Sequence, residues 1–174
     1  SELEKLAEDV KRKLTEIREK IKKLLKETRD VSRELNKELE DLLRRTTEVI
    51  DEIRKKIEKE GPREEVRELL KKLEKDHRKA SEEVERKHED LRRRHDKASK
   101  EVEKELRDLK DEVDKANVDE DIKKEIEDLL RDLERLLRDV NREVEELLKE
   151  NRKRLEEINR TVERLLEEIE KRLR

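Results

Sequence analysis

The sequence predicts an all-α fold, a long, nearly straight, antiparallel three-helix bundle that runs up, down and up. Of its 174 residues, 60% are charged and 29% hydrophobic, and acidic and basic residues are interspersed among good helix formers. Apolar residues recur at helical spacing along three long segments. The single glycine and the single proline are adjacent, at Gly61-Pro62, so the helical pattern is broken at very few places.

The first break separates a helix expected at about residues 2–60 from one expected at about 62–116. The turn between them lies near 61–62. Gly61 suits the left-handed residue that closes a helix, and Pro62 suits the first turn of the next helix.

The second break lies near residues 117–119 and precedes a third helix at about 120–173. Asn117 can take the left-handed closing position, and Asp119 can cap the helix that follows. At the amino terminus, Ser1 and Glu4 have the spacing of a capping box.

These three helices should pack into one domain spanning residues 1–174. Each is on the order of 80 Å long at 1.5 Å per residue, and turns this short force neighbouring helices to be antiparallel. On the second and third helices the apolar seam repeats every 18 residues over five turns, which lies between the left-handed and right-handed supercoil repeats and favours straight helices. The first helix is looser and opens in heptads. One apolar stripe per helix suffices for a single core, so we expect a monomer, with self-association as the alternative.

The seam also contains polar residues in an ordered pattern. Three pairs share an offset of 18 residues: Thr28 and Thr46, His77 and His95, and Asn141 and Asn159. Because 18 residues make five helical turns, each pair lies on one line along its own helix. The wheel positions of all three histidines fall within about 30° of the centre of their apolar face.

Antiparallel pairing indicates which polar residues meet. Across the first turn, the numbers of facing residues should sum to roughly 123, and across the second turn to roughly 236. His77 should therefore meet Thr46 and Asn159.

The same arithmetic places His95 beside Thr28 and Asn141. His88 should lie between Asn151 on one side and Ser32 or Asn36 on the other. The candidate site is a set of buried polar networks: His77, Thr46, Asn159, His95, Thr28, Asn141, His88, Asn151, Ser32, Ser81 and Ser99.

Hydrogen-bond chemistry supports such networks. A neutral imidazole has one donor and one acceptor nitrogen, so one threonine and one asparagine can satisfy both, whereas an unpaired buried group costs roughly 1–3 kcal/mol. All three histidines of the chain lie in these layers, which favours titration as their purpose and predicts pH-dependent folding or conformation. The alternative is a structural scaffold in which the networks only specify fold and register.

The sequence does not favour metal binding, catalysis, nucleic-acid binding or membrane insertion. The histidines are too far apart along their helix to share a metal ion, and the chain has no cysteine. We expect no enzyme, cofactor or small-molecule substrate, because no nucleophile or Gly-rich loop accompanies the histidines. A net charge of −3 gives no basic face for nucleic acid. No apolar run suits a membrane span or signal peptide, so a soluble chain without a targeting signal is expected.

The 18-residue seam, the Glu/Lys/Arg surface, the minimal turns and the layered polar residues resemble de novo designed parametric helical bundles, over the entire chain. The buried His77, His88 and His95 resemble the pH-responsive subset of such designs, which are typically oligomers of helical hairpins that disassemble in acid. This chain carries three helices in one polypeptide, so acid unfolding or loosening is the outcome the resemblance implies, with membrane interaction conceivable only after loosening. A synthetic protein would be expressed in the cytoplasm. Natural three-helix repeats of the spectrin type are the alternative family, but they usually carry core aromatics, which this chain lacks.

Overall fold

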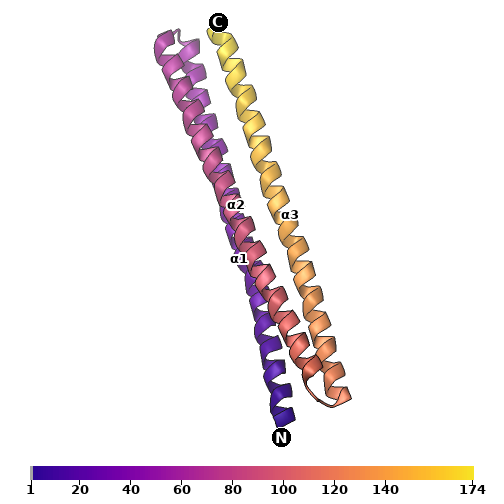
Figure 1. Cartoon of the computed structure of the whole chain (residues 1–174). Helices are drawn as coiled ribbons and strands as arrows, with labels where there is room; N and C mark the ends of the chain where they lie inside the picture. Colours follow the sequence, from indigo (N-terminus) through magenta and orange to yellow (C-terminus); the bar gives the residue numbers. More distant parts are fainter. Residues whose placement is uncertain (1) are drawn as a thin grey trace. The chain divides into compact units, whose positions relative to one another are not determined.

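The computed structural model describes residues 2–174, which form three α-helices: α1 (Glu2–Glu58), α2 (Arg63–Lys115) and α3 (Glu120–Leu173). The predicted all-α, three-helix fold is confirmed (Figure 1). Every helix has acidic residues in its first turn and basic residues in its last turn, which complements the helix dipole.

The helices divide into two compact units. The first unit comprises Ser1–Asp30 and Leu91–Leu147, and the second comprises Val31–Asp90 and Leu148–Arg174. Each unit therefore takes one part of every helix.

Ion pairs across the helices show the same arrangement inside both units. In the first unit, the ammonium of Lys20 lies 2.8 Å from the Glu105 carboxylate. In the second unit, Lys87 lies 2.7 Å from Glu38. Lys13 also pairs with Glu112 in the first unit, and Lys56 with Glu65 in the second. Within each unit, residue numbers therefore rise along α1 as they fall along α2, and the two helices are antiparallel.

α1 and α3 are parallel to each other within each unit. Arg29 bonds Glu143 in the first unit and Arg54 bonds Glu168 in the second, both with a separation of 114 residues. Each of these exposed pairs adds little to the free energy of unfolding, since surface ion pairs contribute about 0–1 kcal/mol each.

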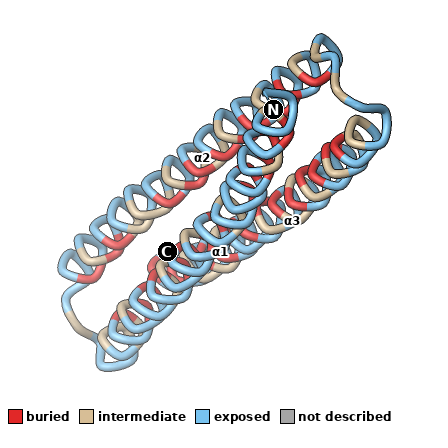
Figure 2. Tube along the Cα trace, turned by 90° about the horizontal axis from the view of Figure 1, so that it is seen from below, coloured by how far each residue is buried: buried red, intermediate tan, exposed pale blue. Residues whose placement is uncertain are grey.

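Aliphatic side chains form the core along one face of each helix, where Figure 2 shows the buried positions. In the second unit, one cluster of buried residues comprises Ile50, Ile53, Val66, Leu70, Leu73, Ile169 and Leu173. Burial of such surface, at about 25 cal/mol per Å², supplies the main driving force for packing.

The first turn closes differently from the prediction. Glu60, with φ of 54°, takes the left-handed conformation, and Gly61 does not. The Glu60 N–H donates to Ile57 O at 3.1 Å and the Gly61 N–H to Lys56 O at 2.9 Å, which is a Schellman closure of α1. Gly61 allows a close approach, because a Cβ at this position would lie 3.2 Å from Lys56 O and would require a small shift of the backbone.

The turn positions of Pro62 and Asp119 are those of helix caps. Pro62 O accepts the Val66 N–H at 3.2 Å, and Asp119 O accepts the Lys123 N–H at 2.9 Å. The left-handed conformation predicted for Asn117 is wrong: among residues 2–174, Glu60 is the non-glycine residue with positive φ. The capping box of Ser1 and Glu4 lies outside the described residues, because Ser1 is not described.

Candidate functional site

The His77 layer lies in the second unit and joins α2 to α3. His77 Nε2 lies 3.0 Å from Asn159 Oδ1, and the Ser81 hydroxyl donates to the same oxygen at 3.1 Å. An amide oxygen only accepts hydrogen bonds, so the neutral imidazole carries its proton on Nε2. Its Nδ1 is then a bare acceptor.

The His95 layer repeats this geometry in the first unit. His95 Nε2 lies 2.8 Å from Asn141 Oδ1, and the Ser99 hydroxyl donates to that oxygen at 3.1 Å. The two layers differ in burial, since His95 is 5% exposed and His77 is only partly buried. The predicted pairing of each histidine with its asparagine is therefore present in both units.

The threonines do not take the place predicted for them. Thr28 and Thr46 are buried, at 2% and 3% exposure. Nevertheless Nδ1 of His77 and Nδ1 of His95, both buried, have no hydrogen-bond partner among residues 2–174. The predicted His–Thr hydrogen bonds are thus wrong.

A serine one turn along α2 joins each histidine network. Ser81 and Ser99 each follow a histidine by four residues, which places both side chains on one helix face. The serine reaches the same asparagine oxygen as the imidazole. Each network therefore closes between α2 and α3 without α1.

His88 is bound in another way. Its Nε2 lies 2.7 Å from the backbone oxygen of Leu148, and its Nδ1 lies 4.0 Å from the Glu89 carboxylate. The hydrogen bond predicted between His88 and Asn151 is not formed. Asn151 instead donates to the Ser32 hydroxyl at 2.8 Å, which joins α3 to α1. Asn36 is exposed.

Burial lowers the pKa of His77, and this effect is opposed by the hydrogen bond to Asn159 and by the negative charge of Glu163. The imidazole is thus neutral at physiological pH. This state agrees with the Nε2–H tautomer that the hydrogen bond to Asn159 requires.

The side chains of Glu74 and Glu170 form a carboxyl pair that the sequence pattern did not predict. Burial raises the pKa of Glu74; the hydrogen bond that its protonated carboxyl donates to Glu170 and the negative charge of Glu170 raise it further, against the opposing charge of Arg78. Glu74 precedes His77 by three residues on α2. No sequence signal separates this pair from the many solvated glutamates around it.

Comparison with known proteins bears on these layers. No protein-family model and no curated protein matches the sequence. A solved structure described as a "Computationally designed three helix bundle" matches with a TM-score of 0.75 and 23% identity, over 99% of this chain and 92% of that one. The chain has the fold of a computationally designed three-helix bundle. At 23% identity this similarity shows the fold alone and says nothing about the chemistry of the polar layers.

The described residues contain neither a candidate metal centre nor a membrane-spanning helix. Within residues 2–174, no group of three histidine, aspartate or glutamate side chains is placed to hold a metal ion. No helix in that range is long and apolar enough to cross a membrane.

Proposed function

We propose that the chain is a designed helical bundle whose buried histidine layers make its folding or conformation pH-dependent. The observation that carries this proposal is the buried Nδ1 of His77 and of His95, which has no hydrogen-bond partner. In the neutral ring this atom is an unpaired acceptor. In the protonated ring it becomes an N–H donor of a cation, again without an acceptor.

Protonation of His77 therefore costs more in the folded chain than in the unfolded one. A charged donor buried without a partner loses its hydration and gains nothing in return. In the unfolded chain the same ring is hydrated and titrates near pH 6.5. The difference favours open or unfolded states in acid.

The sign of the linkage follows from the lowered pKa of His77. At pH 8 both states bind no proton at this site, and stability is independent of pH. As the pH falls through about 6.5, the unfolded chain takes up protons first, and the free energy of unfolding decreases until the folded-state pKa is reached.

A scaffold whose polar layers only specify register is the second candidate, and one contact favours it. The bond from Asn151 to Ser32 is buried, joins α3 to α1 and contains no titratable group. Such a layer selects one pairing of helices over shifted ones, at some cost in stability. It needs no response to pH.

No catalytic role, cofactor or nucleic-acid partner belongs to the proposal. The chain would act as a monomer, because its stripes are used within its own core. Sedimentation equilibrium at neutral pH tests this, and a concentration-dependent mass would contradict it.

Guanidinium unfolding followed by circular dichroism at pH 7.5 and pH 4.5 separates the two functions. The matched control carries glutamine at positions 77, 88 and 95, since glutamine keeps a hydrogen-bond donor without titrating in this range. We expect the midpoint of the parent to fall in acid by more than that of the control. Equal falls in both proteins would assign acid sensitivity to the carboxylates and leave the layers a structural role.

A further inference from the structure

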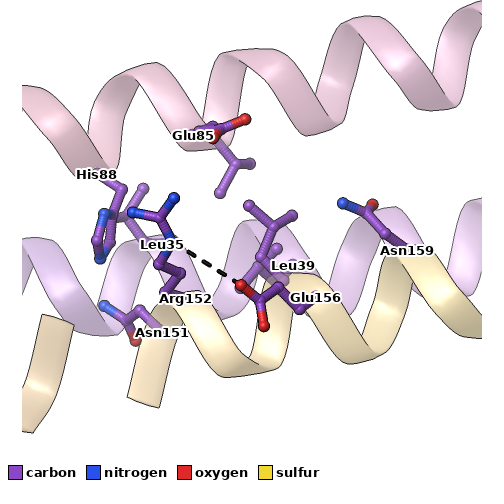
Figure 3. Close-up of a pocket in the computed structure, with 10 residues that line it drawn as sticks. Leu35, Leu39, Glu85, His88, Asn151, Arg152, Glu156 and Asn159 are labelled. Carbon is purple, nitrogen blue, oxygen red and sulfur yellow. Dashed lines mark ion pairs between the residues drawn. The ribbon is translucent and has the colours of Figure 1, made fainter. Parts of the chain in front are cut away.

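A cavity of about 90 Å³ lies inside the second unit, next to two of the polar layers. All three helices line it, as the close-up in Figure 3 shows. Its walls are Leu35, Leu39, Val84, Glu85, His88, Asn151, Arg152, Leu155, Glu156 and Asn159.

The cavity combines an apolar wall with polar ends. Leu35, Leu39 and Leu155 are buried and supply aliphatic surface. Asn159 lies toward one end and His88 with Asn151 toward the other (Figure 3). A ligand in this space would contact apolar groups along its body and amide groups at its ends.

Asn159 offers an unused donor. Its Oδ1 is occupied by His77 and Ser81, while its Nδ2 donates to no residue in the range 2–174. Figure 3 shows this amide nitrogen on the side that faces the cavity. A hydrogen-bond acceptor on a ligand would satisfy it.

The charged lining favours a neutral occupant. Arg152 is paired with Glu89 at 3.6 Å and with Glu156 at 3.9 Å, so its charge is already compensated. Glu85 adds a further carboxylate to the lining. An anion would be repelled, and a cation would have to leave its hydration shell for a largely aliphatic wall.

Size limits the ligand further. A cavity of about 150 Å³ lined by aliphatic and aromatic side chains binds benzene, which has six carbon atoms. In proportion, the present cavity of about 90 Å³ accommodates about four non-hydrogen atoms.

We propose that this cavity is a binding site for small neutral molecules of about four non-hydrogen atoms with one hydrogen-bond acceptor on an apolar body, such as acetone or 2-propanol. Asn159 Nδ2 donates to the acceptor, and Leu35, Leu39 and Leu155 contact the methyl groups. Both probes and the asparagine are uncharged, so binding is measured at pH 7.5, where the His77 bound to Asn159 is neutral.

The 18-residue repeat provides an internal reference in the first unit. Shifted by one repeat, Asn159 corresponds to Asn141 and Val84 to Val102. His88 and Asn151 correspond to the buried residues Leu106 and Leu133. The first unit thus has a matching asparagine with apolar residues in place of the polar end.

Titration of ¹⁵N-labelled protein with acetone at pH 7.5, followed by ¹H–¹⁵N spectra, tests the proposal. We expect a saturable shift of the Asn159 side-chain amide with a millimolar midpoint, and no saturable shift of the Asn141 amide. Small ligands of this size are expected to bind weakly, since each atom contributes at most about 1.5 kcal/mol. Shifts that grow linearly with acetone concentration would show that acetone does not bind in the cavity. Equal saturable shifts at Asn159 and Asn141 would show that binding does not depend on the cavity. Either result would overturn the proposal.

Filling variants give the second arm of the test. Val84→Leu should weaken the saturable shift at least tenfold, while Val102→Leu, the matched change in the first unit, should leave it unchanged. Val84→Ile serves if the leucine variant does not fold. Saturable binding that survives either filling variant unweakened would place the ligand elsewhere and overturn the assignment.

Discussion

His88 donates its Nε2–H to the backbone oxygen of Leu148 at 2.7 Å, a contact that needs no other side chain. Its second nitrogen lies 4.0 Å from the Glu89 carboxylate. His88 thus has a partner at one ring nitrogen and a carboxylate near the other, whereas the buried Nδ1 of His77 and of His95 has no hydrogen-bond partner among residues 2–174. Three histidines that look equivalent in sequence fall into two classes.

This difference predicts which histidines cause the acid response. His77→Gln should remove part of the fall in unfolding midpoint between pH 7.5 and pH 5, because burial lowers the pKa of His77 and glutamine does not titrate in this range. His88→Gln should retain that fall. Guanidinium titrations of both variants at the two pH values provide the measurement, and an acid response abolished by His88→Gln alone would contradict the two classes.

The threonines give a second prediction. Thr46 is buried and makes no hydrogen bond to His77, so Thr46→Val should change the free energy of unfolding by less than about 0.5 kcal/mol or raise it. Thr28→Val should behave alike in the first unit. A loss of about 1–3 kcal/mol in either variant would mean that the hydroxyl satisfies its histidine after all. Chemical denaturation at pH 7.5 measures both.

These residues also show how far sequence reasoning extends. The pairing of His95 with Asn141 was predictable, because turn length and helical rise fix the register of antiparallel neighbours. The absence of a hydrogen bond between His95 and Thr28 was not predictable, because register places two residues at one level without orienting their side chains toward each other. The bond of His88 to Leu148 O was invisible for another reason, since every residue carries a backbone carbonyl.

The two serines form a matched pair for measuring burial. Ser99 and Ser81 make the same 3.1 Å bond to an asparagine, but Ser99 is buried and Ser81 is partly exposed. Alanine raises helix propensity equally at both positions, so the difference between the variants isolates the hydrogen bond in its environment. We expect Ser99→Ala to cost about 0.5–1 kcal/mol more than Ser81→Ala. Equal unfolding free energies for the two variants at pH 7.5 would show that burial does not strengthen the layer.

Glu74 should destabilise the bundle at neutral pH. Its pKa is raised by burial, by the hydrogen bond that its protonated carboxyl donates to Glu170 and by repulsion from the Glu170 carboxylate. In acid both folded and unfolded chains hold the proton, and the group has no effect. As the pH rises above the ordinary value near 4.5, the unfolded chain releases its proton first, so stability is lost until the folded-state pKa is passed.

Glu74→Gln removes this cost while keeping a side chain of the same shape. We expect its unfolding midpoint at pH 7.5 to exceed that of the parent, with the advantage disappearing toward pH 4. Glu74 lowers stability as the pH rises, whereas His77 lowers it as the pH falls. Unfolding midpoints of Glu74→Gln, His77→Gln and the double variant therefore separate the two contributions. The two residues lie three positions apart on α2, and their effects need not add. A midpoint lower than that of the parent at pH 7.5 would mean that Glu74 is stabilised as a carboxylate, with Arg78 outweighing Glu170 and burial.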